Sequence, residues 1–150
     1  MTDYFLNIYL NTKTVGNGWN AADSKLKGAD IKDGFDKTIY VGQGWIDARF
    51  YDRPVIPGVS NSIFLGGVPD LARGGEDVVE AGVGPEVELR RDSDRLPPET
   101  TLIPWGGPFP QGVLVGFGDA VVKTIPYNTP GKSFGSFLTP ANREPVVMPD

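Results

Sequence analysis

Glycine and proline interrupt this chain so often that they limit its fold more than any other feature. The 150 residues include 20 Gly and 14 Pro, and the longest stretches free of both are residues 1–15 and 86–96. An average α-helix takes about 11 residues, whereas an average strand takes about five or six. The spacing therefore predicts an all-β chain built from short strands.

Aromatic content separates this chain from a disordered one. Disordered segments rich in Gly and Pro are poor in aromatic residues, because they bury too little apolar surface to offset the entropy lost on ordering. This sequence contains 3 Trp, 5 Tyr and 8 Phe. We therefore expect a folded domain with a core of its own.

Alternating apolar residues and β-branched runs mark the candidate strands. On residues 4–10 the alternation places Tyr4, Leu6, Ile8 and Leu10 on one expected apolar face. A short helix is expected where Asn20 could act as N-cap and Gly28 as the stop. The number of strands suits a small β-sandwich, jelly roll or barrel. The expected strands are residues 4–10, 38–41, 45–51, 62–65, 86–90, 113–117 and 120–125.

Two proline-spaced segments, residues 96–110 and 126–150, are expected to be extended and irregular. Proline limits the unfolded states of a chain, so such a segment loses less entropy when it docks on another surface. The sequence thus predicts a β body over residues 1–125, with an N-terminal strand or arm, and a C-terminal interaction arm over 126–150. That the arm instead wraps its own body is the alternative. The candidate interaction residues are Tyr4, Phe5, Trp105, Phe109, Tyr127, Phe134, Phe137, Leu138, Val146 and Val147.

Three Val-Gly-x-Gly segments begin at Val15, Val41 and Val115. Their unequal spacing excludes a solenoid repeat. Each is expected to be a tight turn or bulge in which Gly adopts a positive φ and an aromatic ring packs over bare backbone.

The absence of both Cys and His removes the commonest chemistry of sites. Disulfides, thiolate metal sites, catalytic triads and imidazole-ligated zinc or haem are excluded. Asp30, Asp33 and Asp36 surround Gly34 in a loop that could hold calcium, but the 12-residue calcium-loop pattern is missing and a solvated turn is the expected structure. Gly131-Lys132-Ser133 lacks the first Gly of a phosphate loop. We expect a protein that is not an enzyme and uses no cofactor or metal.

Charge and hydropathy limit the partners. The net charge is −5 and no basic stripe is visible, so nucleic acid is not an expected partner. The first residues lack the pattern of a signal peptide, and no apolar run approaches the length of a membrane span. Neither export by a visible signal nor membrane insertion is expected.

In its Gly-punctuated strand region, Val113 to Val122, and in its arms over residues 1–15 and 126–150, the chain resembles the small decoration (cement) proteins of tailed-bacteriophage capsids. The resemblance implies a β-sandwich or barrel body, often trimeric, that is made in the host cytoplasm and binds the virion's capsid surface. There it would stabilise the shell by bridging subunits of the major capsid protein. The alternative is a carbohydrate- or receptor-binding β domain of a tail or fibre, in which Trp45 or Trp105 could stack on a sugar.

Overall fold

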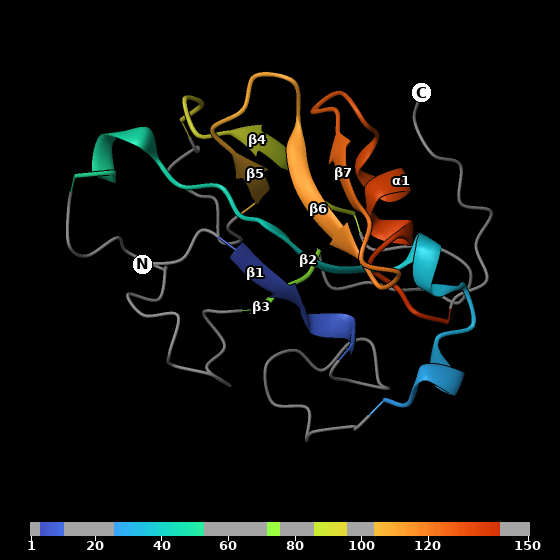
Figure 1. The fold of residues 1–150 in the computed structure, drawn as a ribbon. Helices are drawn as coiled ribbons and strands as arrows, with labels where there is room; N and C mark the ends of the chain where they lie inside the picture. Colours follow the sequence, from blue (N-terminus) through green and yellow to red (C-terminus); the bar gives the residue numbers. More distant parts are fainter. Residues whose placement is uncertain (1–3, 11–25, 53–71, 76–85, 96–103, 142–150) are drawn as a thin grey trace.

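The computed structural model describes residues 4–10, 26–52, 72–75, 86–95 and 104–141. Over these residues the chain forms two β-sheets, one short α-helix and several single-turn 3-10 helices (Figure 1). Strands predominate, as the spacing of Gly and Pro predicts. The expected small all-β class is confirmed.

The larger sheet has five strands in the order β3-β1-β2-β6-β7. Antiparallel pairing joins β1 to β2, β2 to β6 and β6 to β7, whereas β3 runs parallel to β1. A shift in register between Ile39 and Val41 places a bulge at Tyr40. The strands are β1 Tyr4–Asn7, β2 Ile39–Gln43, β3 Ala72–Arg73, β6 Val113–Phe117 and β7 Val122–Ile125.

The smaller sheet consists of two parallel strands, β4 (Leu89–Arg91) and β5 (Trp105–Gly107). An isolated antiparallel bridge between Gly44 and Trp105 links it to the end of β2. The two strands approach closely at Gly106, where a Cβ atom would lie 2.0 Å from the carbonyl oxygen of Arg90. Only glycine fits at that position of β5.

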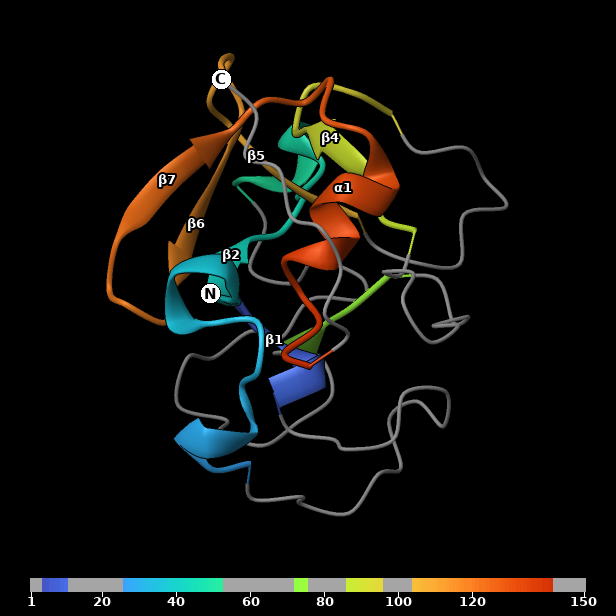
Figure 2. The same ribbon diagram turned by 90° about the vertical axis from the view of Figure 1, so that its right-hand side faces the viewer.

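Helix α1 (Gly131–Ser136) covers one face of the larger sheet, as Figure 2 shows for its position relative to β6 and β7. Phe134 and Phe137 are fully buried there. The Phe134 ring lies 5.8 Å from the Trp105 ring, and the Phe137 ring meets Phe117 edge to face, also at 5.8 Å. The main core thus lies between this helix, β5 and the larger sheet.

Hydrogen bonds join the segment after Pro126 to the first strands. The buried Asn7 side chain donates through Nδ2 to the carbonyl oxygens of Ile39 and Leu138, at 2.7 Å each. The backbone N–H of Ile39 donates to the carbonyl oxygen of Phe137 at 2.8 Å. Residues 126–141 are therefore part of the body.

The expectation of an extended arm beginning at residue 126 is wrong over residues 126–141. Pro130 is the N-cap of α1. A proline is tolerated there because the N–H of this position takes part in no hydrogen bond within the helix. The apolar residues that follow, Phe134, Phe137 and Leu138, have the spacing of one helix face, and all three are fully buried. Residues 142–150 lie outside the described part of the chain.

Strand β1 reverses the expected apolar face. Phe5 and Asn7 are buried, whereas Tyr4 and Leu6 are exposed. The strand also ends early, because residues 8–10 form a 3-10 helix. The described 3-10 helices are η1 Ile8–Leu10, η3 Gly28–Asp30, η4 Phe35–Lys37 and η5 Ala48–Phe50.

The other expected strands have mixed outcomes. Residues 113–117 are confirmed as β6, and β2, β4 and β7 overlap the expected segments. Residues 45–51 instead contain η5, and the segment expected to be irregular contains β5 at residues 105–107. The expected strand 62–65 and the expected helix after Asn20 fall almost entirely outside the described residues.

Of the Val-Gly-x-Gly segments, the two beginning at Val41 and Val115 are described. Their glycines do not adopt the expected positive φ, although Gly118 does lie in the tight turn between β6 and β7. Bare backbone under aromatic rings is confirmed: a Cβ atom on Gly42 would lie 2.8 Å from the Trp105 ring, and one on Gly44 would lie 2.1 Å from the Phe5 ring.

Candidate functional site

The face of the larger sheet opposite α1 carries exposed apolar side chains. Strand register places Leu6 opposite Val41, Val41 opposite Gly116 and Gly116 opposite Val122, in one row across four strands. Leu6 is 59% exposed and Val122 is 67% exposed. We call this surface the outer face; its positions are Tyr4, Leu6, Val41, Gln43, Leu114, Gly116, Val122 and Thr124.

None of these eight positions carries a charged residue, and the polar residues among them are Thr124 and the buried Gln43. Tyr4, two positions before Leu6 on β1, shares its face and is 48% exposed. The nearby Lys123 belongs to the opposite face, because it pairs with the buried Val115, and its Nζ atom lies 4.7 Å from the centre of the Phe117 ring. The outer face is thus uncharged across four neighbouring strands, and its exposed apolar side chains lie on β1 and β7.

The residues predicted from the sequence as interaction residues include exposed residues, buried residues and two that lie outside the described part of the chain. Tyr4 lies on the outer face and Phe109 is exposed in the loop between β5 and β6. Val146 and Val147 lie outside the described residues. The remaining members are core or partly buried residues, which corrects their assignment as interaction residues in the free protein: Phe5, Trp105, Tyr127, Phe134, Phe137 and Leu138.

Tyr127 fixes the start of the C-terminal segment against the smaller sheet. Its hydroxyl donates to the carbonyl oxygen of Gly107 at 2.9 Å, and the Arg91 guanidinium lies 5.5 Å from the centre of its ring. Burial raises the pKa of Tyr127, and the negative charge of Asp92 raises it further. This phenol is therefore a neutral structural donor at ordinary pH.

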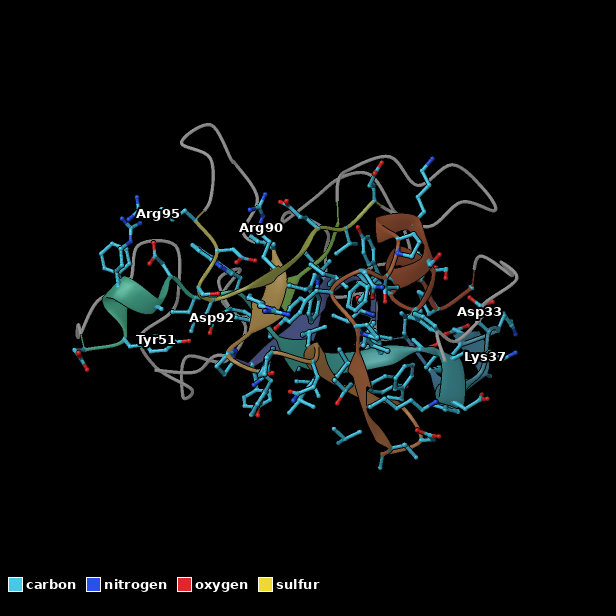
Figure 3. The ribbon with its side chains drawn as sticks, turned by 90° about the horizontal axis from the view of Figure 1, so that it is seen from above. Asp33, Lys37, Tyr51, Arg90, Asp92 and Arg95 are labelled. Carbon is cyan, nitrogen blue, oxygen red and sulfur yellow. The ribbon has the colours of Figure 1, made fainter. Side chains whose placement is uncertain are left out.

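The most buried carboxylate cluster surrounds Asp92, next to the end of β4 (Figure 3). One oxygen of Asp92, Oδ1, accepts from the N–H of Ile46 at 3.0 Å, and the other accepts from the Tyr51 hydroxyl. The Trp45 indole N–H donates to the carbonyl oxygens of Arg91 and Asp94, at 2.8 and 3.1 Å. Each of these polar groups is satisfied within the chain, so the cluster acts as a clamp between residues 45–51 and β4.

Asp47 begins η5 and forms an ion pair with Arg49. Its Oδ1 atom accepts from the Arg49 backbone N–H at 2.9 Å, and both carboxylate oxygens accept from the guanidinium. The side-chain hydrogen bond from Arg49 lowers the pKa of Asp47 below its ordinary value. This arrangement is a helix cap with a local ion pair.

In the acidic loop of residues 30–36, charged side chains make local hydrogen bonds. Asp30 accepts from the Lys27 backbone N–H at 2.9 Å, and the Lys32 ammonium donates to the Ala29 carbonyl oxygen at 2.6 Å. In the described part of the chain, no three Asp or Glu side chains form a group that could hold a metal ion.

Sequence reasoning missed Leu6 and Val122 as surface residues because alternation alone does not say which face of a strand is covered. No signal in the sequence identifies the exposed face of β1. Asn7 is buried because it donates to the carbonyl oxygens of Ile39 and Leu138, and these tertiary contacts place Phe5 and Asn7 on the inner face.

No described helix is long and apolar enough to cross a membrane. Comparisons with protein-family models, with curated proteins and with solved structures found no match to this chain.

Proposed function

We propose that this chain is a non-enzymatic structural protein of a phage virion, which binds the outside of the capsid and bridges major capsid protein subunits. The observation that carries the proposal is the uncharged apolar outer face. Monomeric soluble proteins rarely expose a large contiguous apolar surface, and such surfaces mark sites of interaction.

The composition of the outer face suits a protein partner. The centres of protein interfaces are depleted of charged residues and enriched in tyrosine. A sheet surface bearing Tyr4, Leu6 and Val122 has this composition, with Tyr4 placed as an aromatic anchor. Its breadth, four strands, suits a broad docking contact.

The proposal includes the finer features that the resemblance implies. The two sheets would belong to a small sandwich, jelly-roll or barrel body, and three copies would assemble on the capsid surface after synthesis in the host cytoplasm. Residues 142–150, with Val146 and Val147, would add contacts beyond those of the outer face. Neither nucleic acid nor a membrane takes part.

The carbohydrate-binding alternative receives less support from the structure. Trp105 is fully buried and Trp45 is only 8% exposed, with its indole N–H used inside the chain. Neither ring is available to stack on a sugar. A sugar-dependent change in tryptophan fluorescence would favour the alternative over the capsid role.

The proposal is tested with capsids that lack this protein. Purified wild-type protein is added, and bound protein is measured by sedimentation and negative-stain imaging. The variant Tyr4→Thr/Leu6→Thr keeps β propensity and removes much of the apolar surface of β1. We expect at least a tenfold loss of binding, because two partner-facing apolar side chains are removed.

The matched control is Lys132→Ser, which changes an exposed side chain on α1, on the other side of the sheet. It should bind like the wild type and protect the shell equally against heat. Equal binding by the β1 variant, with its fold intact by circular dichroism, would contradict the proposal.

A further inference from the structure

Strand β7 is an edge of the larger sheet. It pairs with β6 on one side, and no other strand in the described part of the chain pairs with it. Figure 2 shows β7 at the outer margin of the fold. An exposed edge presents unpaired N–H and C=O groups to which another chain can add a strand.

The directions in which the backbone N–H groups of β6 donate decide which backbone groups of β7 point away from the sheet. The N–H of Phe117 donates toward β7, to Val121 at 2.9 Å, whereas the N–H of Gly118 donates toward β2, to Thr38 at 3.0 Å. Antiparallel pairs alternate between hydrogen-bonded and non-hydrogen-bonded. Lys123 and Ile125 therefore direct their backbone groups to β6, while Val122 and Thr124 direct theirs away from the sheet.

The usual protection of an edge is weak here. Proteins commonly place lysine or proline on edge strands to prevent pairing. Lys123 instead holds its ammonium over the Phe117 ring, and Pro126 comes after the strand has ended. Val122 and Thr124 are β-branched and exposed, which favours strand pairing.

We propose that the β7 edge accepts an extended strand from a partner protein, antiparallel to β7, with an acidic residue opposite Lys123. Opposite charges on directly opposed residues stabilise a strand pair. The inference deepens the proposed function and rests on it, because the added strand would extend the sheet whose outer face docks on that partner.

A second copy of this chain fits the edge poorly in each symmetric antiparallel register. Centring the pair on Lys123 opposes two ammonium groups, which is unfavourable. Centring it on Thr124 places Val122 opposite Pro126, which has no N–H. Centring it on Val122 places Thr124 opposite Ala120, whose N–H already donates to Phe117. The geometry therefore favours a strand of different sequence.

The test uses two synthetic nine-residue peptides of alternating valine and threonine that differ only at the central position, glutamate or lysine. Each is titrated into the full-length protein while backbone amide signals are followed by NMR. We expect the signals of Val122 and Thr124 to shift. The glutamate peptide should bind about two- to fivefold more tightly than the lysine peptide.

Three variants sharpen the test. Thr124→Pro removes an outward N–H without removing a hydrogen bond to β6, and it should weaken binding of the glutamate peptide at least tenfold. Thr124→Val keeps that N–H and the β-branched shape, and it should bind like the wild type. Lys123→Glu should reverse the preference between the two peptides.

Failure of the glutamate peptide to shift these two signals would overturn the inference, and so would equal affinity for the two peptides. A concentration-dependent shift of these signals without peptide would overturn it in favour of a second copy. The β1 variant Tyr4→Thr/Leu6→Thr should still bind the peptide, because β1 is separated from β7 by two strands. Its loss of capsid binding therefore tests the proposed function separately from the edge.

Discussion

Both faces of the five-stranded sheet carry apolar side chains, yet those of the inner face are covered whereas several of those on the outer face are exposed. On the inner face, Phe5, Val113 and Val115 are at most 1% exposed beneath other elements of the same chain. On the outer face, Leu6 and Val122 are more than half exposed. The covered side chains of the inner face stabilise the fold, and the proposed function assigns the exposed side chains of the outer face to an interaction.

The largest expected effect comes from removing a side chain that covers the inner face. Phe134→Ala would leave a cavity beside Trp105 and lower the free energy of unfolding by about 3–5 kcal/mol. Leu6→Ala on the outer face should change it by less than about 1 kcal/mol. Urea denaturation followed by tryptophan fluorescence measures the free energy of unfolding of both variants. Similar losses for the two variants would show that the outer face also belongs to the core.

A pair of glycines on opposite faces gives a smaller contrast. In Gly42→Ala on the inner face, the new Cβ would lie 2.8 Å from the Trp105 ring and 2.9 Å from a Val115 methyl. Overpacking of this kind costs about 1–3 kcal/mol. In Gly116→Ala on the outer face, the nearest atom would be a Val41 methyl at 3.1 Å, a half-buried side chain that can adjust.

Gly116→Ala should therefore stay within about 1 kcal/mol of the wild type, because reduced freedom of the unfolded chain offsets part of the crowding. Thermal melts of the two variants provide the comparison. An equal fall in melting temperature would indicate that the outer face is as tightly packed as the inner one.

These contrasts also show what the sequence could and could not predict. Gly and Pro spacing predicted the all-β class, and the run Val113–Phe117 predicted β6, since both depend on local preferences. The face of β1 could not be assigned, because Leu6 and Phe5 are equally apolar and only tertiary structure decides which is covered.

The C-terminal segment was misassigned for a different reason. The expected arm rests on the prolines and does not use the helical spacing of Phe134, Phe137 and Leu138, although a proline at a helix N-terminus is well tolerated. Of the outer face only Tyr4 was predicted as an interaction residue, since the rest depends on the register that brings Leu6 and Val122 into one row.

The turn that leads into β7 offers a stabilising substitution. Ala120 has a φ of 68°, the only positive φ of a non-glycine residue among those described. A Cβ atom in this left-handed conformation costs about 1 kcal/mol relative to glycine. Ala120→Gly should raise stability by about 0.5–1 kcal/mol, measured by urea denaturation, and leave capsid binding unchanged. A loss of binding would mean that the turn itself contacts the partner.

The smallest expected effect is a pH dependence that arises away from both faces. Arg49 lowers the pKa of Asp47 in the folded protein, so the ionised carboxylate stabilises the fold above about pH 4. That contribution is lost as the pH falls through the lowered pKa. The melting temperatures of the wild type and Asp47→Asn should differ at pH 6 and converge towards about pH 2. A difference in melting temperature that stays constant with pH would show that ionisation of Asp47 does not cause it.

The most direct test of the contrast between the faces compares two tyrosines that are equally exposed. Tyr4 on the outer face and Tyr51, next to η5, are each 48% exposed in the free chain. Hydroxyl-radical footprinting of the free and the capsid-bound protein measures how far each becomes covered. We expect modification of Tyr4 to fall severalfold on binding while that of Tyr51 changes little. An unchanged Tyr4 in the bound protein would contradict docking through the outer face.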